Sequence, residues 1–305
     1  MTQQSLFLLV CSFFSALAAA AERPPIVGIA NFVVATDSID EARRFYTGVL
    51  GYDEAFTHKR TGVAGDVVSF KVNDQQCIEV SQTLQNQADD KLIQIGYETS
   101  NARQLRDYLA EKGVKVPAQV ETDPDGNLSF TVMDPENHRV EFVQYMPGSA
   151  QSKTAGKMVS AKRISDHMLH VGIHVQDEKA ADGFYKDILG FRPLWKGGNS
   201  DERFEWISLL VPDGNNWVEY MMWKDTPPDP KRLGVLHHVC VGTHDIQAVY
   251  KTVQERGYEP PRAPNVARDG RWLLHLFDKH NTRTEVMIRK PVQKPCCSEL
   301  TDPYE

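Results

Sequence analysis

The sequence has few cysteines and no excess of positive charge, and both absences narrow the class of protein. Only five of the 305 residues are cysteine. Cys77 and Cys240 lie in apolar, strand-like runs, where buried free thiols are expected. Cys296 and Cys297 are adjacent, which makes them geometrically poor partners for each other, so we expect no disulfide framework. The formal net charge of −7 gives no electrostatic reason to expect a nucleic-acid or anionic-lipid partner.

A membrane-spanning segment is also not expected. The apolar run Leu6–Ala20 is short for a membrane span, and Ala19, Ala20 and Ala21 offer small side chains for signal-peptidase cleavage before Glu22. We therefore interpret residues 1–21 as a signal peptide. The mature protein is then secreted or periplasmic and has no membrane contact after cleavage.

The sequence contains an internal duplication. Phe45-Tyr46 followed by Leu50-Gly51-Tyr52 matches Phe184-Tyr185 followed by Leu189-Gly190-Phe191, at a constant offset of 139 residues (184 − 45). Each half also contains a weaker internal repeat of a strand followed by a helix. Residues 101–114 and 244–258 both have the pattern of an amphipathic helix that ends at a glycine. The chain therefore divides into four units of a strand, a helix and several further strands, at residues 26–82, 91–146, 167–224 and 235–289.

These units predict the domain organisation. Hydrophobic residues at 41% and charged residues at 25% describe a soluble globular protein, and 305 residues suffice for two domains. We expect an N-terminal domain at 22–147, a small polar linker at 148–166, a C-terminal domain at 167–290 and a flexible tail at 291–305.

Histidine and glutamate recur as a pair of pairs in the second half. Glu219 follows His170 by 49 residues (219 − 170), and Glu285 follows His238 by 47 (285 − 238). Each histidine opens an apolar strand-like run, and each glutamate lies within a closing one. Two imidazoles and two carboxylates from repeated units can converge on one divalent metal ion.

The four units, their FY-x3-LG-[FY] helices and the closing sequences DPENHRVE and DKHNTRTE resemble the vicinal oxygen chelate (glyoxalase, bleomycin-resistance and extradiol dioxygenase) superfamily. The resemblance implies an α+β fold in which four βαβββ modules pair into two half-open barrels. It implies one divalent metal ion (Fe, Ni, Zn or Mn) and a small-molecule substrate. The family's ligand positions fall on His170, Glu219, His238 and Glu285 in the C-terminal half, and on Asn31, Glu79, Gln94 and Glu141 in the N-terminal half. Because Asn and Gln are poor metal ligands, the N-terminal site is expected to be degenerate.

The number of ligands separates the chemistries that the resemblance implies. Four ligands leave two places for vicinal substrate oxygens, as in a glyoxalase-like or epimerase-like lyase or isomerase with Glu219 or Glu285 as the base. Three ligands without Glu219 form the triad of an Fe(II) extradiol dioxygenase. A non-catalytic small-molecule binding protein is a third alternative. Trp217, His174 and His275 are candidates for the substrate pocket, and a homodimer is one possible assembly.

Overall fold

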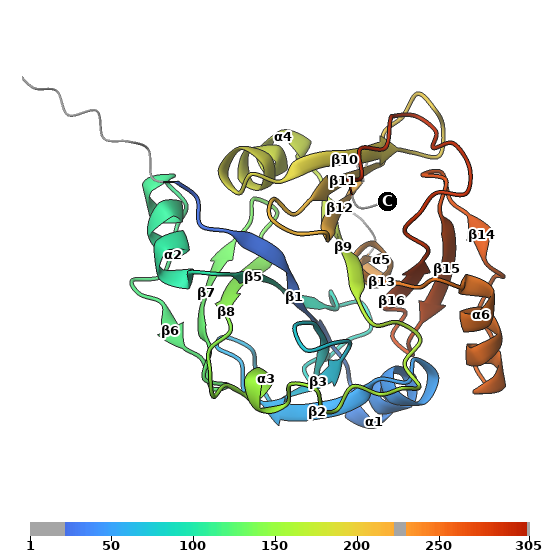
Figure 1. Ribbon diagram of the computed structural model, residues 1–305, viewed down its shortest axis with the longest axis horizontal. Helices are drawn as coiled ribbons and strands as arrows, with labels where there is room; N and C mark the ends of the chain where they lie inside the picture. The colour runs from blue at the N-terminus through green and yellow to red at the C-terminus, as the bar shows by residue number, and fades with distance from the viewer. Residues whose placement is uncertain (1–21, 223–229, 304–305) are drawn as a thin grey trace, which may run out of the picture.

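The computed structural model describes residues 22–222 and 230–303, which form two similar halves in succession (Figure 1). The N-terminal half contains β1 (Ile26–Ala35), α1 (Ile39–Arg43), the π-helical turn η1 (Arg44–Val49), β2 (Asp53–His58), β3 (Val67–Lys71), β4 (Cys77–Ser81), β5 (Leu92–Thr99), α2 (Ala102–Glu111), β6 (Glu121–Thr122), β7 (Leu128–Met133) and β8 (Arg139–Gln144). The short helix α3 (Ala150–Lys153) follows in the linker. The expected signal peptide lies outside the described residues.

The C-terminal half repeats this order of elements. It contains β9 (Met168–Val175), α4 (Glu178–Asp182), η2 (Gly183–Ile188), β10 (Arg192–Gly197), β11 (Trp206–Leu210), β12 (Trp217–Met222), α5 (Pro230–Leu236), β13 (His238–Gly242), α6 (Ile246–Glu255), β14 (Asn265–Val266), β15 (Trp272–Phe277) and β16 (Arg283–Met287). The helix α5 has no counterpart among the described elements of the N-terminal half.

Each half forms one curled sheet of eight strands. The strand orders are β2-β3-β4-β1-β5-β8-β7-β6 and β10-β11-β12-β9-β13-β16-β15-β14. In both sheets the first strands of two modules pair antiparallel in the centre, and each pairs parallel with the last strand of its own module. The predicted α+β fold of two half-open barrels with paired βαβββ modules is therefore confirmed. This topology makes β12, β9, β13 and β16 neighbours.

The repeated sequence signals have repeated local structures. The four module helices α1, α2, α4 and α6 follow the N-cap residues Ser38, Asn101, Asp177 and Asp245, and each cap side chain accepts a backbone hydrogen bond from the first turn. The Leu-Gly pairs end η1 and η2, and Gly51 and Gly190 have φ angles of 81° and 78°. These left-handed conformations strain a residue with a Cβ atom, so glycine suits both turns.

One hydrophobic core extends across both halves. Its buried residues include Phe32, Tyr97 and Phe142 from the first half and Phe191 and Tyr220 from the second. The rings of Tyr97 and Phe191 meet edge to face, with their centroids 5.4 Å apart. The two sheets are therefore packed together rather than separated by a flexible linker.

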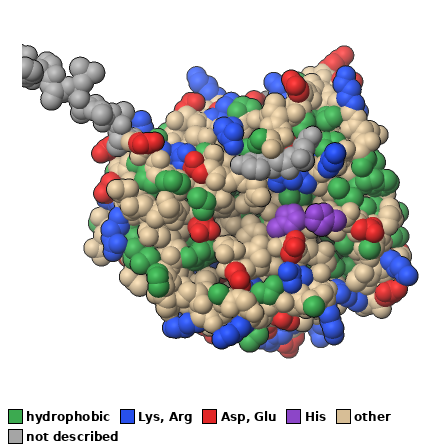
Figure 2. Space-filling view, in the orientation of Figure 1, with side chains coloured by type: hydrophobic (Ala, Val, Ile, Leu, Met, Phe, Trp, Pro, Cys, Tyr) green, Lys and Arg blue, Asp and Glu red, His purple; other side chains and the backbone are tan. Residues whose placement is uncertain are grey.

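The outer surface carries both signs of charge. On the face shown in Figure 2, acidic and basic side chains are interspersed, in agreement with a chain whose net charge is −7. Among the described residues, no helix is both long enough and apolar enough to cross a membrane.

Candidate metal centre

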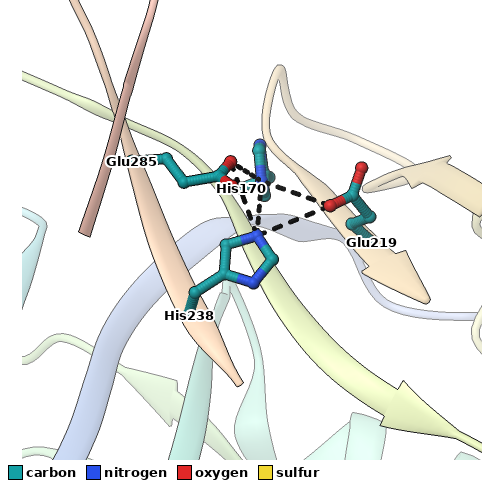
Figure 3. Close-up of side chains that lie close together, drawn as sticks. All are labelled: His170, Glu219, His238 and Glu285. Atoms are coloured by element: carbon teal, nitrogen blue, oxygen red, sulfur yellow. Dashed lines mark hydrogen bonds and ion pairs between the residues drawn. The ribbon is translucent and has the colours of Figure 1, made fainter. Parts of the chain in front are cut away.

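The four residues of the His–Glu pattern lie together in the C-terminal barrel. His170 lies on β9, Glu219 on β12, His238 on β13 and Glu285 on β16, and their side chains point toward one another (Figure 3). One ligand atom from each residue lies within 4.8 Å of those from the other three. The convergence follows from the sheet, because these strands are adjacent and residues two apart share a face.

The spacing of the ligand atoms suits a divalent metal ion. The Nε2 atoms of His170 and His238 are 3.1 Å apart. Oε2 of Glu285 lies 3.3 and 3.5 Å from these two nitrogens, and Oε2 of Glu219 lies 3.8 and 3.5 Å from them. Metal–ligand bonds of about 2.1 Å place two adjacent octahedral ligands roughly 3 Å apart. The set therefore fits one cation at its centre.

A glycine makes room for one of these ligands. Gly172 on β9 is paired with His238 on β13, and a Cβ atom built on Gly172 would lie 2.0 Å from Cε1 of His238. No side chain larger than hydrogen fits at this position unless the imidazole moves. Gly172 is thus a requirement of the site that the spacing of histidines and glutamates did not indicate.

The protonation states also suit a metal. Burial and the charge of Arg283 lower the pKa of His238 and favour its neutral form. Nδ1 of His238 lies 2.9 Å from the carbonyl oxygen of Leu236 and 2.8 Å from Nη2 of Arg283. A proton on Nδ1 suits the first contact and not the second, and it leaves a lone pair on Nε2 for a metal. Burial opposes ionisation of Glu285, but Arg283 and His238 hold its pKa well below the usual range. Burial likewise opposes ionisation of Glu219, yet its hydrogen bond with His238 and the charge of His170 lower its pKa.

A cavity of about 500 Å³ opens onto this set. Trp206, Met221 and Leu273 contribute apolar surface to its walls, and Glu219 and Glu285 contribute carboxylates. The cavity is large enough for a small molecule, and a substrate in it would reach both carboxylates.

The three expected pocket residues have different positions. His275 lines the cavity, and its Nε2 lies 3.1 Å from Oε1 of Glu285. Trp217 lies behind the ligands, where its ring centroid is 4.9 Å from that of His170. His174 is not among the residues that line the cavity. Burial and the nearby charge of His237 lower its pKa.

Arg283 is a functional candidate that the sequence pattern missed. Its side chain is buried in the cavity wall, where Nη1 lies 3.3 Å from Oε1 of Glu285 and Nη2 lies 2.8 Å from Nδ1 of His238. Its position in the sequence could have indicated this role. Arg283 lies two residues before Glu285 on the same strand, and residues two apart on a strand point to the same face.

The corresponding place in the N-terminal barrel is filled by an arginine. The Nη1 atom of Arg60 donates to Oε2 of Glu141 at 2.7 Å, and its Nη2 donates to Oε1 of Glu79 at 2.8 Å. Asn31, at the position equivalent to His170, donates from Nδ2 to Oε2 of Glu141 at 3.0 Å. One guanidinium group therefore binds the two carboxylates whose counterparts in the C-terminal half belong to the candidate metal centre.

Cys296 and Cys297 form a disulfide with a sulfur–sulfur distance of 2.08 Å, so the expectation that they are poor partners was wrong. Their Cα atoms are only 3.8 Å apart, below the usual range for disulfides, and the adjacent residues nevertheless pair. Asp201 lies beside them, but the disulfide leaves no thiolate to bind a metal. Cys77 and Cys240 are free and buried, as predicted.

The fold and the site define a protein of paired βαβββ modules with one candidate metal centre. A sequence model described as the Glyoxalase/Bleomycin resistance protein/Dioxygenase superfamily matches residues 28–142 and 167–286. The chain belongs to this superfamily, which confirms the resemblance inferred from the sequence. Its known members include small-molecule enzymes of more than one class.

Individual relatives are distant. Lactoylglutathione lyase of Haemophilus influenzae is 24% identical over 112 residues, which cover 36% of this chain and 83% of that protein. The structure of Mn(II)-bound glyoxalase from Novosphingobium aromaticivorans aligns with a TM-score of 0.64 at 15% identity, over 91% of this chain and 86% of that one. Homoprotocatechuate 2,3-dioxygenase from Arthrobacter globiformis aligns with a TM-score of 0.65 at 16% identity, over 93% and 85%. These structural similarities establish the fold, and they do not choose between the two reactions.

Proposed function

We propose that the protein is a metal-dependent lyase or isomerase that acts on a small molecule with vicinal oxygens. The observation that carries this proposal is the position of Glu219, whose Oε2 lies 3.5 Å from Nε2 of His238 and 3.8 Å from Nε2 of His170. A fourth ligand at this place leaves two coordination positions of a six-coordinate ion for the substrate. A bound divalent ion would serve there as a Lewis acid toward two adjacent substrate oxygens.

Glu219 is the better candidate for the base that moves a proton. Oε1 of Glu285 lies 3.1 Å from His275 and 3.3 Å from Arg283, so this carboxylate is held on both sides. The ion pairs of Glu219 with the histidines all involve Oε2, and its side chain is 15% exposed in the cavity wall. Glu219 is ionised at neutral pH, and its pKa is lowered less than that of Glu285. It is therefore the stronger base of the two toward a proton on a carbon next to a carbonyl group.

The test is proton exchange by metal-loaded protein. Small α-hydroxy ketones in D₂O should incorporate deuterium at the carbon next to the carbonyl, as followed by NMR. Glu219→Gln should slow this exchange by about a hundredfold or more, the usual contribution of a general base. Glu205→Gln is the matched control, because Glu205 lines the same cavity but lies outside the group of four.

The dioxygenase alternative predicts a different result from the same protein. Fe(II)-loaded protein prepared without oxygen, then given catechols and O₂, should consume no oxygen on our account. Oxygen uptake with ring cleavage, together with no exchange of substrate protons, would replace the lyase or isomerase proposal. Binding of such compounds without either reaction would favour a non-catalytic binding protein.

Export is part of the proposal. It depends on the signal-peptide interpretation of residues 1–21, and the Cys296–Cys297 disulfide supports it because disulfides persist in oxidising compartments. The amino-terminal sequence of protein recovered from outside the cytoplasm should begin near Glu22.

A further inference from the structure

The two histidines of the metal centre are held in different ways. Nδ1 of His238 lies 2.9 Å from the carbonyl oxygen of Leu236, whereas Nδ1 of His170 is buried without a hydrogen-bond partner among the described residues. A metal-binding histidine usually has its second ring nitrogen fixed by a hydrogen bond. The orientation of the His170 ring must therefore come from packing.

Trp217 supplies that packing. Its ring lies 4.9 Å from the His170 ring between centroids, with the two planes inclined by 30°. Trp217 is 1% exposed and belongs to a small apolar cluster separate from the main core. The N-terminal barrel has Cys77 at the matching position, where β4 pairs with Asn31, so the tryptophan accompanies the half that has the histidines.

Two arginines hold the tryptophan. The guanidinium carbons of Arg271 and Arg289 lie 5.2 and 5.4 Å from the centre of the Trp217 ring. Each contact is favourable because the face of the ring is electronegative. Two cations that approach one ring repel each other, however, and the arrangement needs a negative charge nearby.

Asp302 in the C-terminal tail provides such a charge to both arginines, whereas Asp269 lies 3.3 Å from Arg271 alone among these two. Oδ2 of Asp302 accepts from Nη2 of Arg271 at 3.0 Å, and Oδ1 of Asp302 accepts from Nη2 of Arg289 at 2.8 Å. The side chain of Asp302 is fully buried. Removal of this buried carboxylate would leave two guanidinium groups without their shared partner, and an uncompensated buried charge is strongly destabilising.

The tail is fastened around this position. Thr301 donates from its backbone N to the carbonyl oxygen of Leu194 at 2.9 Å, and Leu300 packs against the apolar cluster that contains Trp217. Nearer β14, the backbone N of Cys296 donates to the carbonyl oxygen of Arg268 at 2.9 Å. Figure 1 shows this final segment running past β10. The expected flexible tail has no helix or strand in its described residues, 291–303, and its mobility stays a prediction.

We propose that Asp302 is a positioning residue for the metal centre. It holds Arg271 and Arg289 against Trp217, and Trp217 in turn sets the orientation of the His170 ring. The C-terminal tail thereby contributes a positioning residue to the metal site, although the tail lies outside the repeated modules. The role in metal binding rests on the proposed function. The effect of Asp302 on the orientation of the His170 ring can be tested in metal-free protein.

The test compares Asp302→Asn with Glu299→Gln in the full-length mature chain. Both variants remove one carboxylate from the same tail, but Glu299 is exposed and lies outside the chain of contacts. The first measurement is the NMR signal of the His170 ring in metal-free protein, assigned by its loss in His170→Gln. We expect this signal to move in Asp302→Asn and to stay in place in Glu299→Gln.

The second measurement is the affinity for Mn(II) and Zn(II). Asp302→Asn should weaken metal binding by about tenfold or more, because substitution of residues that orient a metal ligand commonly lowers metal affinity by that much. Glu299→Gln should keep an affinity within about twofold of the wild type. Should Asp302→Asn fail to fold, Arg289→Gln removes one of the two cations and should shift the same signal. An unmoved His170 signal in a folded variant overturns the proposal. Wild-type protein that binds no metal would instead overturn the proposed function, while the ring signal still decides the role of Asp302.

Discussion

At the scale of the residue, a few charged side chains decide what each barrel can bind. Both barrels keep two glutamates at equivalent positions, Glu79 and Glu141 in one and Glu219 and Glu285 in the other. Arg60 binds both members of the first pair, whereas the second pair faces two imidazoles. A buried pair of carboxylates requires a cation in either case, because uncompensated buried charge is very costly.

His58 makes the N-terminal barrel sensitive to pH. Burial by itself lowers the pKa of His58, but the carboxylates of Glu79 and Asp125 outweigh it and raise the pKa to about 9, from 6.5 in the unfolded chain. The folded state thus keeps a proton that the unfolded state loses. The stabilisation is complete below pH 6.5 and is lost as the pH rises through about 9.

The expected size of this effect is at most about 3 kcal/mol, since the pKa rises from 6.5 to about 9 and each pKa unit corresponds to about 1.4 kcal/mol. Urea unfolding of the wild type and His58→Gln at pH 6 to 10 measures it. The free energy of unfolding of the wild type should fall more steeply than that of the variant. The exposed His244→Gln should behave as the wild type, and equal slopes for wild type and His58→Gln would show that His58 carries no such proton.

The sequence indicated some of these residues and not others. The sequence indicated that His170, Glu219, His238 and Glu285 lie together, because duplication repeated their spacing and alternation along strands gave them a common face. Arg60 and Asp302 had no such signal. Each reaches its site from outside the repeated pattern, from the loop after β2 and from the tail, and loop geometry is not encoded in periodicity.

At the scale of the element, the close pairing of the central strands governs both sites. Gly172 on β9 faces His238 on β13, and Gly96 on β5 faces Asn31 on β1. Added Cβ atoms would lie 2.0 Å from Cε1 of His238 and 2.2 Å from Nδ2 of Asn31. A glycine is therefore required beside the imidazole of His238 in one half and beside the amide of Asn31 in the other.

This symmetry provides a matched pair of variants. Gly172→Ala should displace His238 and weaken metal binding by at least about tenfold. Gly96→Ala should leave metal affinity unchanged, and both substitutions should lower the free energy of unfolding by about 1–3 kcal/mol through overpacking. Calorimetric metal titration together with urea unfolding makes the comparison. Equal loss of affinity in both variants would contradict the assignment of the metal to the C-terminal barrel.

Element boundaries were predicted approximately. The helices expected at 101–114 and 244–258 occupy Ala102–Glu111 and Ile246–Glu255, because the expected ranges include the caps and the terminal glycines. The Phe-Tyr segments form π-helical turns, which the amphipathic pattern did not distinguish from an ordinary helix.

At the scale of the whole molecule, duplication has produced two barrels with different contents. The number of modules followed from the internal repeats. Their pairing into two half-open barrels and the degenerate N-terminal site followed from the resemblance to the superfamily. The docking of the tail and the shared core between the halves did not, because both depend on contacts between segments far apart in the chain. The whole chain is therefore expected to bind one metal ion.

The most direct test of this account is the metal content of the mature protein after reconstitution with Mn(II), Zn(II) or Fe(II). Elemental analysis should find about one ion per chain in the wild type and in His244→Ala. It should find almost none in His170→Ala/His238→Ala that circular dichroism shows to be folded. Wild-type protein without bound metal, or equal metal in the double variant, would contradict a metal centre formed by His170, Glu219, His238 and Glu285.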